Sequence, residues 1–106
     1  MREYQQIREQ LRSELRGVLG DRVYFSANAP QGWLQLPRVH ALLHELITAL
    51  STQLQIEAAG VEAQGNRAEA ERLRRRATAL GEMRLGWHDA GRQQQLWNLV
   101  WRDSAW

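Results

Sequence analysis

The stretch VHALLHELITALSTQL, residues 39–54, carries the strongest hydrophobic pattern in this chain. Its large aliphatic side chains recur at spacings of three and four residues, which places them on one face of an α-helix. These side chains are Val39, Leu42, Leu43, Leu46, Ile47, Leu50 and Leu54. Pro37 suits the first turn of such a helix, because an amide hydrogen is not needed there. The pattern therefore predicts a buried helix over residues 38–59.

A second helix is predicted over residues 67–85, antiparallel to the first. Its inner face is made of Ala70, Leu73, Ala77 and Leu80. The stretch 58–66 contains the glycines and the asparagine of a chain reversal, and Asn66 is a good N-cap for the helix that follows. The facing apolar stripes of these two helices are expected to form the core.

Two more helices are expected to flank this pair. Residues 2–19 carry an apolar stripe at helical spacing, made of Tyr4, Ile7, Leu11, Leu15 and Val18. Glycines at 86 and 91 predict a break before a last helix at about 90–102. The predicted fold class is therefore mainly α, a four-helix arrangement around an antiparallel helix pair.

A small β-hairpin is predicted between the first two helices, within residues 22–36. Residues 22–26 are β-branched and aromatic, residues 28–32 have turn chemistry, and residues 33–36 can return as a second strand. A lone hairpin is marginal in water, so this one would have to pack on the helices or pair with another chain.

Length and composition limit the classes of protein to consider. The chain has 106 residues and no cysteine, and we expect one domain over residues 1–106. It lacks both the run of about 18 apolar residues that a membrane span needs and an apolar signal segment. Without cysteine it has no disulfide and no thiol nucleophile, which suits a reducing, cytoplasmic compartment.

All 14 basic residues are arginine, yet the formal net charge is only +2. A chain with this charge does not carry the strong field of a dedicated nucleic-acid binder. The arginine bias is typical of a GC-rich genome, and we interpret it as a sign of a bacterial, plasmid or phage protein. Selection for anion recognition by arginine is the functional alternative.

The C-terminal segment, residues 96–106, is unusually apolar. On a helix, Trp97 and Trp101 point about 100° away from the neighbouring aliphatic residues, so the apolar arc spans roughly 200°. Such a segment is either a central core helix or a binding surface, and tryptophan and arginine are enriched at binding hot spots. The candidate partner-binding residues are Trp97, Trp101, Trp106 and Arg102.

Two arginine-rich helix faces are candidates for a different function. They comprise Arg8, Arg12 and Arg16 in the first helix and Arg72, Arg75 and Arg76 in the third. Guanidinium groups on one face can contact phosphates, so a nucleic-acid-binding subunit is the alternative function. The simpler interpretation is a solvated surface, because Glu69 and Glu71 stand at pairing distance along the third helix.

His40 and His44 have a metal-like spacing, since residues four apart share a helix face and can both ligate one ion. No local spacing supplies a third ligand, so they are weak metal candidates and more simply cover the core. The sequence also lacks nucleophile-elbow glycines, a phosphate-binding glycine loop and lysine. We therefore expect no enzymatic activity, no cofactor and no small-molecule substrate.

Together these patterns predict a non-enzymatic protein-binding module. It would be a small accessory or inhibitor protein that docks on a larger protein or forms a homodimer. The hypothesis depends on the apolar arc of the C-terminal segment being too wide for one small chain to bury.

Overall fold

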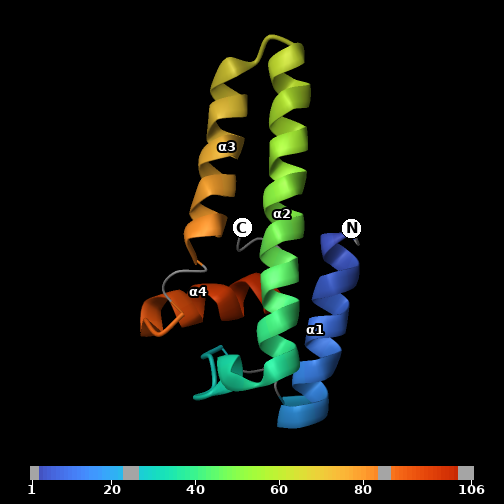
Figure 1. Cartoon of the computed structure of the whole chain (residues 1–106), viewed down its shortest axis with the longest axis vertical. Helices are drawn as coiled ribbons and strands as arrows, with labels where there is room; N and C mark the ends of the chain where they lie inside the picture. The colour runs from blue at the N-terminus through green and yellow to red at the C-terminus, as the bar shows by residue number, and fades with distance from the viewer. Residues whose placement is uncertain (1–2, 23–26, 84–86, 103–106) are drawn as a thin grey trace.

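The computed structural model describes residues 3–22, 27–83 and 87–102. Within these ranges the chain forms four α-helices and no β-strand, which confirms the mainly α class. The elements are α1 (Tyr4–Leu19), the short 3-10 helix η2 (Trp33–Gln35), α2 (Pro37–Ala63), α3 (Arg67–Glu82) and α4 (Ala90–Trp101) (Figure 1). None of the described helices is long and apolar enough to cross a membrane.

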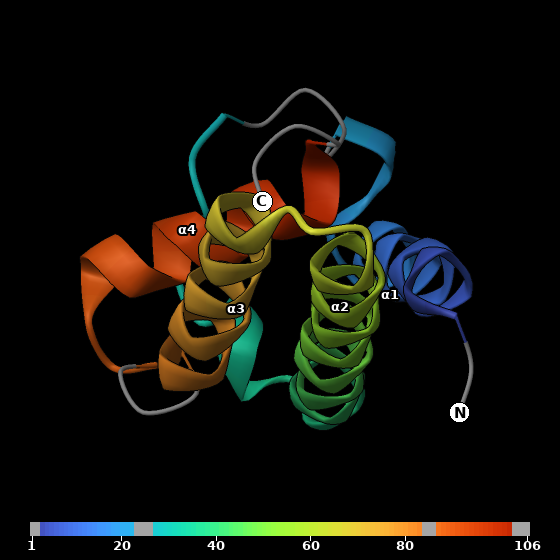
Figure 2. The same ribbon diagram turned by 90° about the horizontal axis from the view of Figure 1, so that it is seen from above.

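Helices α2 and α3 form the predicted antiparallel pair, as both views show (Figures 1 and 2). The reversal between them uses Gly65 at φ +89°, a conformation that glycine adopts without steric cost. Asn66 then caps α3, because its side-chain oxygen accepts a hydrogen bond from the Glu69 amide at 3.2 Å. Helix α2 runs to Ala63, past the predicted end at residue 59, because this turn is so short.

Helices α1 and α4 cover the part of the pair nearer to the start of α2. In Figure 1, α1 descends beside α2 and α4 crosses the pair at a steep angle. Asp89 starts α4 by accepting a hydrogen bond from the Arg92 amide at 3.0 Å. The four helices and η2 share one hydrophobic core, so the predicted arrangement around the antiparallel pair is correct.

The predicted β-hairpin is wrong. Residues 23–26 of its first strand lie outside the described residues, and Trp33–Gln35 form η2 where the second strand was expected. The side chain of Gln94 on α4 accepts a hydrogen bond from the Ala29 amide at 2.9 Å and donates one to the Ala27 carbonyl at 2.8 Å. Because a side chain satisfies these backbone groups, the loop needs no partner strand there.

The far half of the α2–α3 pair projects beyond α1 and α4 (Figure 1). We call this projection the arm; it comprises residues 54–63 of α2 and the turns of α3 that face them. The radius of gyration is 14.7 Å, larger than the ~13 Å expected for a compact chain of this length. The arm accounts for the difference, and it leaves one side of α2 uncovered.

Candidate functional site

Trp97, a predicted partner-binding residue, lies in the core with an exposed fraction of 1%. Its ring meets Trp33 of η2 edge-on, with centroids 5.0 Å apart, and lies 5.6 Å from the ring of Trp101. Leu96, Leu99 and Val100 are also buried. The expectation that this chain cannot cover its own apolar arc is therefore wrong for residues 96–100, because α1 and η2 pack against α4.

The other predicted partner-binding residues differ from Trp97 in their exposure to solvent. Trp101 is half-buried, Arg102 is exposed, and Trp106 lies outside the described residues. Arg12 covers Trp101, with its guanidinium carbon 5.8 Å from the ring centroid, and its Nε–H donates to the Val100 carbonyl at 2.7 Å. Arg12 thus stabilises the C-terminal end of α4, where helix carbonyls lack partners within the helix.

The first arginine face is not a continuous solvated surface. Arg8 is fully buried, and its guanidinium lies 5.8 Å from the centre of the Tyr4 ring. Arg12 is engaged at α4, and Arg16 also makes an interaction within the protein. Since a buried guanidinium cannot reach a phosphate, the prediction that Arg8 contacts nucleic acid is wrong.

Two of the five arginines of α3 are engaged with carboxylates. Arg72 donates two hydrogen bonds to Glu69, and Arg74 donates one to Glu62 of α2. These hydrogen bonds hold the pKa of Glu62 and of Glu69 below the ordinary carboxyl value. Arg76 interacts within the protein, whereas Arg75 is exposed to solvent. The solvated-surface interpretation of this face therefore describes Arg72 and Arg74 well.

His40 and His44 pack around the indole of Trp87. The two imidazole centroids lie 4.4 and 4.6 Å from the Trp87 ring, and 4.8 Å from each other. No group of three or more histidine, aspartate or glutamate residues in the described ranges is placed to hold a metal ion. An open cavity of about 510 Å³ adjoins this cluster, lined by His40, Trp87, His88 and several glutamines. The role that the structure shows for the histidine pair is aromatic packing.

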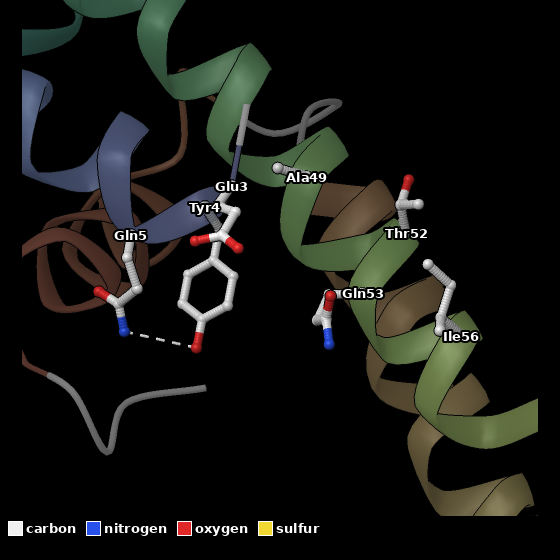
Figure 3. Close-up of a pocket in the computed structure, with 7 residues that line it drawn as sticks. All are labelled: Glu3, Tyr4, Gln5, Ala49, Thr52, Gln53 and Ile56. Carbon is white, nitrogen blue, oxygen red and sulfur yellow. Dashed lines mark hydrogen bonds between the residues drawn. The ribbon is translucent and has the colours of Figure 1, made fainter. Parts of the chain in front are cut away.

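A second open groove, of about 390 Å³, lies where the N-terminal end of α1 meets the middle of α2. Figure 3 shows Glu3, Tyr4 and Gln5 on its α1 side, with the hydrogen bond between Gln5 and the Tyr4 hydroxyl. The α2 side is lined by Ala49, Thr52, Gln53 and Ile56. Apolar and amide groups make up most of this groove, and Glu3 supplies a carboxylate at its end.

The groove opens onto a stripe of α2 that continues along the arm. Below the groove, the same side of α2 carries Leu42 and Leu46, which are buried. Beyond the N-terminal end of α1 the stripe goes on at spacings of three and four residues. We call this part the α2 seam; it follows the buried Ala49, and its residues are Gln53, Ile56, Gly60 and Ala63.

Ile56 is the residue of the seam that the sequence analysis missed. Its exposed fraction is 61%, the highest among the large hydrophobic side chains of the described residues. It lies two positions after Leu54, which puts it about 200° around the helix from Leu54 and on the same side as Leu42, about four turns earlier. An isoleucine between two polar neighbours, Gln55 and Glu57, was the available signal, but the position of α1 beside it could not be predicted from the sequence.

Comparison with protein-family models, with curated proteins and with solved structures finds no match for this chain.

Proposed function

We propose that this chain is a non-enzymatic protein-binding module that receives an α-helix on the α2 seam. The observation that supports the proposal is that one face of α2 is buried near the start of the helix and exposed to solvent along the arm. Helix α1 packs against α2, Leu42 and Leu46 of α2 are buried, and further along the same face Ile56 is 61% exposed. A helix packed on that face would extend the intramolecular α1–α2 contact along the arm, as in helix-in-groove recognition.

The shape of the seam fits a helix better than a small molecule. From Gln53 to Ala63 it extends about 15 Å, almost three turns of a straight helix. Small-molecule sites are concave and bury most of the ligand, whereas this groove is open along one side. Gly60 and Ala63 are small and exposed, so a second helix can approach α2 closely.

Two observations support a protein partner over a nucleic acid and over a catalytic role. Arg8 is buried and Arg12 and Arg72 are engaged within the protein, which weakens both predicted arginine faces. The hydroxyl of Ser51 donates to the Ala77 carbonyl at 3.2 Å, a structural use that joins α2 to α3. The proposed function therefore keeps the protein-binding hypothesis but moves its surface from the tryptophans to the seam.

Site-specific photo-crosslinking tests this function. A benzophenone amino acid is placed at position 56 in the seam, or at position 55 as the matched control; both residues are exposed. Illumination of cells that express each variant is expected to give a discrete covalent adduct from position 56 and none from position 55. Equal labelling at the two positions, or no adduct at position 56, would contradict the proposal.

A further inference from the structure

We propose that the helix received by the α2 seam belongs to a second copy of this chain, so that two arms pack antiparallel around a two-fold axis. This inference rests on the proposed function and names its partner. Three features support it: the shape of the seam, the charges at its two ends, and its length.

The shape of the seam is self-complementary. Ile56 projects from it, and one turn further Gly60 has open space where a Cβ would lie. When two α2 helices run antiparallel with the axis at the level of Ala58, Ile56 of each copy falls opposite Gly60 of the other. By the same register Gln53 falls opposite Ala63. Each contact between a large and a small residue therefore occurs twice, once on each side of the two-fold axis, as in any isologous interface.

The charges at the two ends of the seam are also complementary. Glu3 lies in the groove at one end, and Arg67 is exposed in the first turn of α3 at the tip of the arm. Within the described residues neither side chain makes a salt bridge, although the positive charge of Arg67 helps to lower the pKa of Glu62. The antiparallel register brings the groove of one copy, beside Gln53, to the tip of the other, beside Ala63. Glu3 of each copy therefore approaches Arg67 of the other.

The length of the seam predicts a reversible dimer. In this register the two α2 helices overlap from Gln53 to Ala63, a contact about 15 Å long, which with the flanking α1 residues falls at the small end of specific interfaces. Interfaces of that size are typical of weak and transient complexes, so we expect a dimer that dissociates on dilution. The dimer should form and separate as concentration changes.

Sedimentation equilibrium across a concentration series tests the shape of this interface. Gly60→Leu fills the space opposite Ile56 and is expected to weaken the dimer about tenfold or more. Because a Cβ at Gly60 meets nothing within 4 Å in one copy, the variant should not lose thermal stability as a monomer. Gln55→Leu is the matched control and is expected to leave dimerisation unchanged. A dimer that Gly60→Leu does not weaken would overturn the proposed register.

A charge exchange tests the partner's identity and orientation. Glu3→Arg and Arg67→Glu are each expected to weaken the dimer about 2- to 30-fold at low salt. The double variant restores both pairs in reversed order and should return close to wild-type dimerisation. A double variant as weak as the singles, or a wild type that stays monomeric at millimolar concentration, would overturn the second-copy inference. In the latter case an adduct of position 56 with a different protein would leave the proposed function standing.

Discussion

Trp97→Ala is the substitution that separates a core role for the C-terminal tryptophans from a surface role. Trp97 is 1% exposed and packs edge-on against Trp33 at 5.0 Å. If Trp97 belongs to the core, its removal should destabilise the whole fold. If it formed part of a docking surface, the isolated chain would tolerate the change.

The expected magnitude follows from the burial of the indole. A fully covered tryptophan removes about 150–250 Å² from water, which corresponds to about 4–6 kcal/mol of transfer free energy. Truncation of large aromatic residues in cores costs about 3–5 kcal/mol, because the surroundings relax only in part. We therefore expect the free energy of unfolding to fall by about 3–5 kcal/mol. This loss is a large part of the roughly 5–15 kcal/mol that stabilises a small domain.

Urea unfolding followed by circular dichroism at 222 nm measures this loss. Ile56→Ala is the matched control, because Ile56 is 61% exposed, and its change should stay within about 1 kcal/mol. Should Trp97→Ala fail to fold, Trp97→Phe retains part of the packing and is expected to lie between wild type and unfolded chain. A Trp97→Ala variant that unfolds within about 1 kcal/mol of wild type would refute the core role.

Three further outcomes are expected. Asn66→Ala removes the cap on the Glu69 amide and should lower the free energy of unfolding by about 0.5–2 kcal/mol in the same urea assay, whereas Asn66→Asp should not. The Arg74 hydrogen bond lowers the folded-state pKa of Glu62, so the pair stabilises the fold above the ordinary value of 4.5 and loses this effect as pH falls through the lowered pKa. The Tm difference between wild type and Arg74→Gln should therefore shrink below pH 4.5, and a constant difference would argue against the pair. A labelled oligonucleotide should show no shift with this protein in native gels even at low ionic strength; salt-sensitive binding would restore the nucleic-acid alternative.

The helices were predictable because their signals are local. Each signal depends only on residues that are close together in the chain. These signals are the apolar stripe from Val39 to Leu54, the N-cap at Asn66 and the glycine before it. The predicted boundaries of α1 and α4 lie within two residues of those observed. The pairing of α2 with α3 followed from the short reversal between them.

The errors concern contacts between residues far apart in the chain. Residues 33–36 were expected to return as a strand, but Trp33–Gln35 form η2, and Trp33 packs edge-on against Trp97, 64 positions away along the chain. Arg8 has the spacing of a surface residue, yet it is fully buried beside Tyr4. Periodicity identifies which side of a helix is apolar, but it does not identify the element that covers that side.

The sequence by itself determined the four helices, the antiparallel pair and the lack of recognisable catalytic motifs, because propensity, capping and periodicity act within a few residues. Only the tertiary structure decided which apolar surface remains open. Trp97 is enclosed because α1 and η2 converge on α4, and Ile56 stays exposed because α1 begins too far down α2 to reach it. Exposure depends on where neighbouring elements start and stop in space, and no single helix encodes that.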